Sequence, residues 1–305
     1  MKILLTGGSG MVGSNILEHK SRKFHNVIAP TSHDLNLLDP ENIKTFLKTE
    51  KPDLIIHAAG KVGGIQANIN NPIAFLLDNL KMGTDLIYSS FEIGIPYFIN
   101  IASSCMYPKD ALNPLNEEMI LSGKLEPTNE GYALAKTIST RLCEYISNKD
   151  SKKVYRTIIP CNLYGRFDKF SPKHSHLLPA IIRKIHYAQI NGEQEVSIWG
   201  DGNARREFMY CKDLADFIFF TIEHLDKIPQ NINVGIGHDY SITEYYKTVA
   251  RVIGYKGKFT HDLSKPEGMK QKLVDITKLK QIGWSNKTSL VDGIKETYNF
   301  FTESC

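Results

Sequence analysis

The sequence predicts an α/β protein: a Rossmann-type, doubly wound parallel sheet followed by a smaller C-terminal α/β substrate lobe. Three observations lead to this prediction. Short apolar runs alternate with helical patterns over residues 1–160, which is typical of βαβ units around a buried sheet. A glycine-rich turn follows the first apolar run directly. After Pro160 the alternation becomes less regular and the loops lengthen, as expected for a lobe that binds a substrate.

The expected elements of the first part alternate along the chain. Strands are expected at residues 2–6, 26–30, 53–59, 97–102 and 153–160. Helices are expected from the glycines to about residue 23 and over about residues 40–50, 72–91 and 132–147. Asp39 followed by Pro40 is a typical helix start, because the aspartate accepts from free amides and proline fits the first turn. The run 53–59 is apolar almost throughout, as a strand covered on both faces must be.

The second part is expected to hold helices separated by longer loops. These loops lie at residues 164–175, 191–195 and 201–207. Ser241 and Glu244, three residues apart, form a capping box that predicts a helix to about residue 253. A last helix is expected over about residues 289–301. The sequence contains no internal repeat, so a solenoid is not expected.

Composition excludes several classes of protein. The 305 residues are 42% hydrophobic, 10% aromatic and 23% charged, which excludes a disordered or fibrous chain. The apolar stretches are far shorter than the ~20 residues of a membrane helix, and no signal-peptide pattern follows Met1. We therefore expect a cytoplasmic protein without a membrane partner. The net charge of +4 is spread without long blocks, so nucleic acid is not expected as a partner.

Cysteine usage predicts reduced thiols. The number is odd and no CxxC pair occurs, so neither a disulfide framework nor a metal site is expected. The cysteines are Cys105, Cys143, Cys161, Cys211 and Cys305.

The glycine-rich turn between the first strand and the first helix predicts a dinucleotide site. Glycines there allow a tight turn and let backbone amides approach a pyrophosphate at the helix start. Its spacing is GxxGxxG, and the alternative is an ordinary strand-to-helix turn. The residues expected to bind the cofactor here are Gly7, Gly8, Ser9, Gly10, Met11, Val12 and Gly13.

The end of the second strand indicates which dinucleotide is bound. NAD is expected where an acid follows this strand, because the acid bonds the ribose hydroxyls. Here Pro30 and Thr31 are followed by Ser32 and His33, and an acid comes only at Asp34. This favours NADP(H), with Ser32 and His33 near the 2′-phosphate, and leaves NAD(H) as the alternative.

We therefore expect an NADP-binding Rossmann domain over residues 1–163. A mainly substrate-binding lobe is expected over 164–305, of which about 205–240 returns to the first domain.

A serine, a tyrosine and a lysine predict a hydride-transfer site. Tyr132 and Lys136 are four residues apart on a helix, so both project from one face. An ammonium beside a phenol stabilises the phenolate, which makes the tyrosine a usable acid near neutral pH. Ser103 follows a strand at the sheet edge where ligands of open α/β sheets bind. Tyr132 would protonate the oxygen of a reduced carbonyl, Ser103 would bond that oxygen, and Lys136 would also hold the nicotinamide ribose.

With these motifs the chain resembles the GDP-L-fucose synthase family of the extended short-chain dehydrogenases/reductases. The resemblance runs nearly end to end. It is carried by Val62-Gly63-Gly64-Ile65, the runs 103–109, 125–132 and 162–165, Ser175-His176, Trp199-Gly200, Arg206-Glu207-Phe208, Lys265-Pro266, and Leu273 with Asp275.

The resemblance implies a reaction in two parts on a GDP-linked 4-keto-6-deoxy sugar, a hexose or a heptose. Epimerisation at C3 and C5 is followed by reduction of the C4 ketone by NADPH. One carbonyl acidifies the protons on both neighbouring carbons, which makes this sequence chemically reasonable. By position in the motifs, Cys105 would be the base and His176 the acid of the epimerisation. The alternatives are that Cys105 is a structural thiol and that His176 is an ordinary loop imidazole. The protein would then be a C4 reductase without epimerase activity. A dinucleotide sensor without catalysis is a more remote alternative.

The resemblance also implies further binding residues and a partner. For the cofactor these are Ala58, Ala59, Lys136, Pro160, Asn162, Leu163 and His176. For the nucleotide sugar they are Lys184, Trp199, Arg206 and Asp275. A homodimer is expected through a helix bundle that includes the helix of Tyr132.

Overall fold

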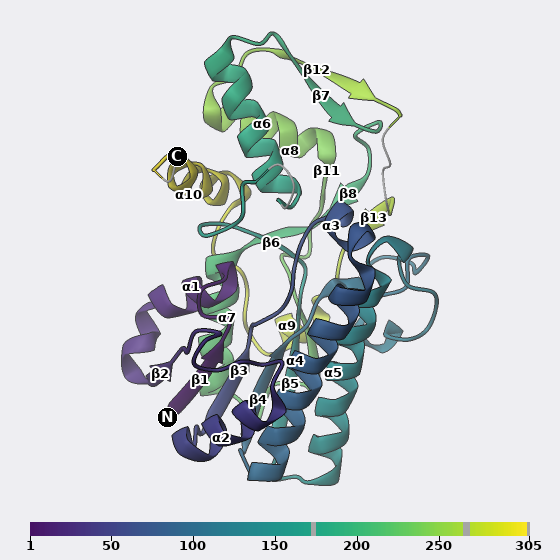
Figure 1. Ribbon diagram of the computed structural model, residues 1–305. Helices are drawn as coiled ribbons and strands as arrows, with labels where there is room; N and C mark the ends of the chain where they lie inside the picture. Colours follow the sequence, from purple (N-terminus) through teal and green to yellow (C-terminus); the bar gives the residue numbers. More distant parts are fainter. Residues whose placement is uncertain (172–174, 265–268, 304–305) are drawn as a thin grey trace.

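The protein consists of two lobes (Figure 1), and the structure, a computed structural model, describes residues 1–171, 175–264 and 269–303. Among the residues named above, Lys265, Pro266 and Cys305 lie outside this description. The larger lobe is built on a parallel six-stranded sheet in the order β10-β5-β4-β3-β1-β2. Its strands are β1 (Lys2–Thr6), β2 (Asn26–Ile28), β3 (Leu54–His57), β4 (Tyr97–Ile101), β5 (Val154–Pro160) and β10 (Asn231–Val234).

Helices cover both faces of this sheet, because successive residues of each strand point to opposite faces. Ile3 and Leu5 pack into one core with α1 (Met11–Glu18) and α7 (Cys211–Glu223). Leu4 packs into a second core with α2 (Pro40–Glu50), α4 (Pro72–Ile93) and α5 (Glu130–Lys149). The two long helices α4 and α5 lie side by side (Figure 1). The predicted Rossmann-type doubly wound fold is therefore confirmed.

The smaller lobe contains three helices and several short strands. The helices are α6 (Leu177–Asn191), α8 (Ile242–Ile253) and α10 (Leu290–Glu303). β7 (Glu195–Trp199) pairs with β12 (Lys258–Asp262), and a three-stranded sheet is formed by β8 (Arg205–Arg206), β11 (Tyr240–Ser241) and β13 (Gln271–Lys272). β6 (Asn162–Tyr164) pairs with β9 (Phe208–Tyr210) between the two lobes. Short elements are α3 (Ile65–Asn70), α9 (Thr277–Gln281) and the 3-10 turns η1 (Lys20–Phe24), η2 (Ser104–Met106), η3 (Glu117–Met119) and η4 (Pro127–Asn129).

The path of the chain differs from a simple division into two halves. After β6 the chain enters the smaller lobe, and α7 and β10 then lie on the six-stranded sheet, where β10 pairs with β5. The flanking strands β8 and β11 pair with each other in the smaller lobe. Within the ranges that the structure describes, no helix is long and apolar enough to cross a membrane.

Local signals in the sequence predict most helix starts but not every helix end. Asp39 accepts from the amides of Glu41 and Asn42, and the capping box of Ser241 and Glu244 is formed. The single helix expected as far as residue 23 is wrong, because α1 ends at Glu18. His19 there has an extended backbone, and its side chain accepts from the amide of Ser21 to start η1 instead.

Candidate active site

The glycine turn after β1 is shaped so that only glycine fits at two positions. Gly7 has φ +74°, and a Cβ on it would lie 2.6 Å from the amide nitrogen of Ala59. A Cβ on Gly13 would lie 2.1 Å from the carbonyl oxygen of Gly7. The turn therefore packs tightly against the end of β3. Gly10, which precedes α1, brings no capping side chain, so the first amides of α1 can bind a pyrophosphate.

The loop after β2 presents hydroxyl and imidazole groups to solvent. Asp34, whose side chain is 58% exposed, has a carboxylate that accepts from the Thr31 hydroxyl at 2.7 Å and from the Thr31 amide at 3.2 Å. These hydrogen bonds lower the pKa of Asp34. Ser32 is exposed, and the side chain of His33 is 98% exposed. This surface suits the 2′-phosphate of NADP better than a loop with a free acid at the strand end.

The structure brings Ser103, Tyr132 and Lys136 together at the carboxyl end of β4. Ser103 starts η2, and its hydroxyl accepts from the amide of Cys105 at 3.3 Å. Tyr132 and Lys136 lie one turn apart on α5, and the Lys136 ammonium is 5.9 Å from the centre of the tyrosine ring. Lys136 Nζ donates to the carbonyl of Ile101 at 2.9 Å, which fixes the ammonium at this strand end.

Burial sets the protonation of this group. It raises the pKa of Tyr132, the nearby Cys105 raises it further, and a hydrogen bond with Ser103 opposes the rise. Burial lowers the pKa of Lys136 to about 8. Burial and the Lys136 charge also lower the pKa of His57 to about 3, so His57 is neutral and bonds Thr6 at 2.9 Å. Tyr132 is therefore a protonated phenol with the Lys136 ammonium beside it.

Cys105 lies directly beside this group. It is 6% exposed and packs with Leu125, Ala133 and the ring of Tyr132. Burial raises the pKa of the Cys105 thiol, while Lys272, Ser103 and Lys136 act to lower it. Lys272 was not among the residues that the sequence predicted for the site. It lies on β13 directly before Leu273, and only the three-dimensional fold places it near Cys105.

His176 lies on the smaller lobe. It precedes α6, its side chain is 42% exposed, and its Nδ1 lies 4.0 Å from an oxygen of Asp168. Asp168 also was not predicted from the sequence.

The four expected substrate residues separate into two groups. Lys184 donates to the carbonyl of Ser197 in β7, and Trp199 at the end of β7 is 61% exposed, which excludes a buried structural tryptophan. Arg206 on β8 is partly buried, and burial lowers its pKa while Glu126 acts to raise it. The carboxylate of Asp275 instead accepts from the amide of Thr277 at 2.7 Å, at the start of α9. The role of Asp275 in substrate binding stays a prediction.

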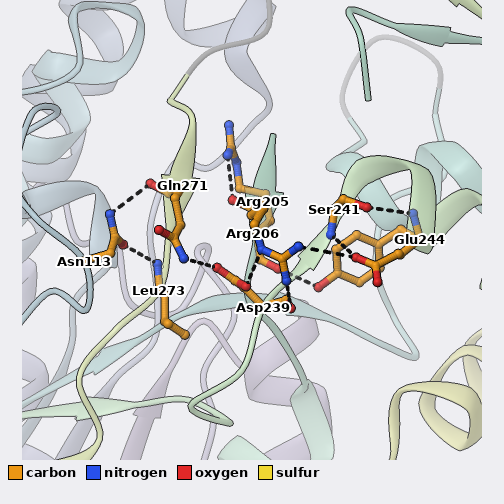
Figure 2. Close-up of polar contacts among 9 residues, drawn as sticks. Asn113, Arg205, Arg206, Asp239, Ser241, Glu244, Gln271 and Leu273 are labelled. Carbon is orange, nitrogen blue, oxygen red and sulfur yellow. Dashed lines mark hydrogen bonds and ion pairs between the residues drawn. The ribbon is translucent and has the colours of Figure 1, made fainter. Parts of the chain in front are cut away.

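A network of polar side chains holds β8, β11 and β13 together (Figure 2). Asp239, which is 5% exposed, accepts from Arg205 Nε at 2.7 Å and from Gln271 Nε2 at 2.6 Å. Arg205 also pairs with Glu244 at 3.6 Å. Asn113 of the larger lobe reaches across, and it accepts from the amide of Leu273 at 2.8 Å. This network fixes the strands that carry Arg206 and Lys272.

Glu207 joins the same strands to the larger lobe. Its side chain is fully buried and accepts from the amides of Ile236 and Gly237, both at 2.7 Å, and of Val274 at 2.9 Å. The Asn162 amide group donates to its backbone carbonyl at 2.8 Å. Burial raises the pKa of Glu207 to about 7, although the three backbone amides act to lower it.

A glycine turn for a dinucleotide, beside a serine, a tyrosine and a lysine at the sheet edge, defines the class of Rossmann-type oxidoreductases. The sequence pattern of the "NAD dependent epimerase/dehydratase family" matches residues 3–237. GDP-L-colitose synthase of Yersinia pseudotuberculosis is 58% identical over 301 residues, 99% of this chain and 98% of that protein. GDP-L-fucose synthase of Escherichia coli (strain K12) is 38% identical over 99% of this chain and 97% of that protein.

Solved structures agree with these relatives. A GDP-6-OMe-4-keto-L-xylo-heptose reductase from C. jejuni has a TM-score of 0.92 at 30% identity, with 100% of this chain and 98% of that chain covered. A GDP-mannoheptose C4 reductase from Campylobacter jejuni with NADP bound has a TM-score of 0.89 at 31% identity, with 99% and 98% covered. The chain therefore belongs to the NAD dependent epimerase/dehydratase family and, within it, to the GDP-L-fucose synthase group of nucleotide-sugar oxidoreductases.

Proposed function

We propose that the protein reduces the C4 ketone of a GDP-linked 4-keto-6-deoxy sugar with NADPH, and that it first epimerises the sugar at C3 and C5. The observation that carries this proposal is the position of Cys105 beside Ser103, Tyr132 and Lys136 at one strand end. A proton acceptor for carbon chemistry and a proton donor for the carbonyl oxygen are thus in one place. The names of the relatives, GDP-L-colitose synthase and GDP-L-fucose synthase, support the substrate class.

In the reduction, bound NADPH supplies a hydride to C4. Tyr132 donates its phenolic proton to the C4 oxygen, so the carbonyl becomes a hydroxyl and Tyr132 becomes a phenolate. The Lys136 ammonium, fixed by the carbonyl of Ile101, stabilises that phenolate. Ser103 donates a hydrogen bond to the same sugar oxygen. The turn from Gly7 to Gly13 and the exposed Ser32 and His33 hold the cofactor, and the relative solved with NADP bound supports NADP over NAD.

In the epimerisation, the Cys105 thiolate removes a proton from a carbon next to the C4 ketone. The C–H electron pair then lies in the enolate, which His176 protonates on the other face, so the configuration inverts. The cations Lys272 and Lys136 favour the thiolate against the effect of burial. Arg206 and Lys184 suit the negative charge of a nucleoside diphosphate, and the exposed face of Trp199 suits a flat or apolar group.

The experiment is incubation with GDP-4-keto-6-deoxy-mannose in deuterated water, first without and then with NADPH or NADH. Deuterium at C3 and C5 and the product configuration are read by NMR and mass spectrometry. We expect exchange at both carbons that disappears in Cys105→Ser and His176→Asn, followed by a reduced, inverted product with NADPH. Cys143→Ser is the matched control, because Cys143 is also a buried free thiol, on α5 in the core that contains Leu4. NADPH oxidation without exchange would leave a C4 reductase, and cofactor binding without oxidation of NADPH by any keto sugar would leave a sensor.

We also propose a homodimer through α4 and α5, working in the cytoplasm. Large apolar side chains are exposed at helical spacing on both helices: Ile73, Leu77 and Tyr88 on α4, and Ile138 and Tyr145 on α5. An exposed apolar stripe of this kind is typical of an interface. The buried free thiols fit a reducing compartment. Light scattering should give twice the chain mass, and Ile138→Glu combined with Tyr145→Glu should give the single chain mass.

A further inference from the structure

The loop between β6 and α6 is held in an unusual backbone conformation. Phe167 has φ +68°, in the left-handed region that bulky residues rarely adopt. Two contacts hold it there. The Arg166 guanidinium pairs with both oxygens of Glu18 in α1, at 3.0 and 3.3 Å, and the ring of Phe167 meets Phe300 edge-on at 5.0 Å. Strained residues persist only where their surroundings fix them, and they gather at functional sites.

Asp168, the next residue of this loop, carries a buried carboxylate. The side chain of Asp168 is 5% exposed. Its Oδ1 accepts from the amide of Lys169 at 2.7 Å, and its Oδ2 is buried with no hydrogen-bond partner in the part of the chain that the structure describes. A buried carboxylate is costly unless a partner satisfies it. Beside this carboxylate lies His176, whose Nδ1 is 4.0 Å from Oδ1, the oxygen that also accepts from Lys169.

We propose that Asp168 is the positioning residue for His176, an inference that rests on the proposed role of His176 in the epimerisation. The Asp168 carboxylate accepts a hydrogen bond from Nδ1–H, so that the other ring nitrogen, Nε2, carries the proton that is transferred. In the step, the Nε2–H bond breaks, the enolate electron pair forms the new C–H bond, and His176 becomes a neutral ring with its proton on Nδ1. Solvent then restores the Nε2 proton at the 42% exposed ring.

The 4.0 Å separation is compatible with this role. Catalytic hydrogen bonds are often long in ligand-free enzymes and tighten when the substrate binds. A carboxylate that orients a histidine affects turnover far more than affinity, because it fixes the tautomer of the ring rather than a contact with the substrate. A carboxylate that only completes the loop would instead affect stability and leave the tautomer of His176 unchanged.

The test compares Asp168→Asn with Glu18→Gln. Asparagine keeps the size of the side chain, while Glu18→Gln weakens the anchor of the same loop without touching His176. Two quantities are measured: the tautomer of neutral His176, by long-range proton–nitrogen NMR with His176→Asn as the assignment reference, and the rate of deuterium exchange at C3 and C5. In Asp168→Asn we expect a shift from the Nδ1–H to the Nε2–H tautomer and roughly a ten- to hundredfold loss of exchange turnover with little change in KM. NADPH oxidation with the already epimerised keto sugar should be unchanged.

The outcomes separate the two proposals. The Nδ1–H tautomer and normal exchange in Asp168→Asn, or an equal loss of exchange in Glu18→Gln with the tautomer unchanged, would overturn the role of Asp168. If His176→Asn keeps full exchange, the proposed epimerase acid is wrong, and the tautomer still reports whether Asp168 orients the ring. If Asp168→Asn does not fold, as judged by circular dichroism, Asp168→Ser, which leaves room for water at the carboxylate position, takes its place with the same expected results.

Discussion

The two sides of the candidate active site are positioned by different forces. On the larger lobe, Ser103 and Tyr132 are carried by β4 and the long helix α5, which pack into apolar cores on both faces of the sheet. On the smaller lobe, Arg206 and Lys272 lie on strands of only two residues. Those strands are held by the buried carboxylates of Glu207 and Asp239. Apolar packing thus fixes Ser103 and Tyr132, whereas the positions of Arg206 and Lys272 depend on hydrogen bonds to individual buried carboxylates.

This difference predicts how each side responds to substitution. Apolar packing is spread over many residues, so a catalytic side chain on α5 can be changed without loss of the fold. A buried carboxylate that satisfies several backbone amides has no substitute nearby, so its loss leaves those amides unpaired. Substitutions on the larger lobe should therefore change catalysis without changing the free energy of unfolding. Substitutions on the smaller lobe should change both.

The largest effect should come from Tyr132→Phe. Removal of the phenolic oxygen deletes the proton donor while the ring still packs beside Cys105. We expect reduction to fall by about 10² to 10⁴-fold, the usual contribution of a general acid. The melting temperature and the exchange at C3 and C5 should stay close to those of the unchanged protein. NADPH oxidation, thermal unfolding and deuterium incorporation measure the three quantities, and a parallel loss of all three would contradict the separation of chemistry from stability.

Glu207→Ala should test the smaller lobe. The amides of Ile236, Gly237 and Val274 lose their acceptor, and a cavity replaces the side chain. We expect the free energy of unfolding to fall by about 4 kcal/mol, since each unpaired buried amide costs about 1–3 kcal/mol and water can satisfy some of them. Urea unfolding measures the change. Glu195→Gln, at the exposed start of β7, is the control and should change stability by less than about 0.5 kcal/mol.

The pH dependence of the free energy of unfolding should reveal the titration of Glu207. The folded pKa of Glu207 is about 7 and its ordinary value is 4.5, so between these values the folded state holds a proton that the unfolded state has lost. The contribution of Glu207 is therefore fully present below pH 4.5 and is lost as the pH rises to 7, a decrease of about 3 kcal/mol. Urea unfolding from pH 4.5 to 8 measures it. Glu207→Gln cannot titrate and should remove this part of the slope, and an unchanged slope would contradict the assignment.

Asp239→Asn should give the smallest effect. Asparagine places an amide group against either Arg205 or Gln271, which weakens one bond of the network in Figure 2. Arg205 is 40% exposed, so solvent screens its ion pair and we expect a stability loss of only about 1 kcal/mol. The KM for the GDP-sugar should rise several-fold with kcat nearly unchanged. Steady-state kinetics measures both. Glu92→Gln, which breaks an exposed pair with Lys44, should leave the kinetics unchanged.

The sequence was sufficient to predict the larger lobe because its signals are local. The strands are apolar runs, α2 and α8 have their capping residues, and Tyr132 and Lys136 share a helix face by spacing alone. Ser103 could be placed because ligands of such sheets bind at strand ends. Of the residues expected from the family resemblance, Cys105 lies beside Tyr132 and His176 directly precedes α6, while their catalytic roles stay predictions.

The smaller lobe was less predictable for a physical reason. Strands of two residues, such as β8 and β13, have no period to recognise, and what holds them are contacts between residues far apart in the chain. Lys272 approaches Cys105 only through such folding. Asp168 lies only eight residues before His176, but no local pattern indicates that its carboxylate is buried beside the histidine ring. The one signal that could have indicated Lys272 is its position directly before Leu273, one of the residues that carry the family resemblance.

The pairing of β10 with β5 has a consequence for synthesis of the chain. β10 is made only after the residues between Pro160 and Asn231, most of which lie outside the sheet. Until then a growing chain presents Thr157 to Pro160 as a bare, apolar strand edge, which is a template for aggregation. A polypeptide cut at residue 163 should accordingly precipitate instead of binding a dinucleotide, although it holds the whole glycine turn. The larger lobe can therefore complete its sheet only after the first part of the smaller lobe has been synthesised, because β10 follows that part in the chain.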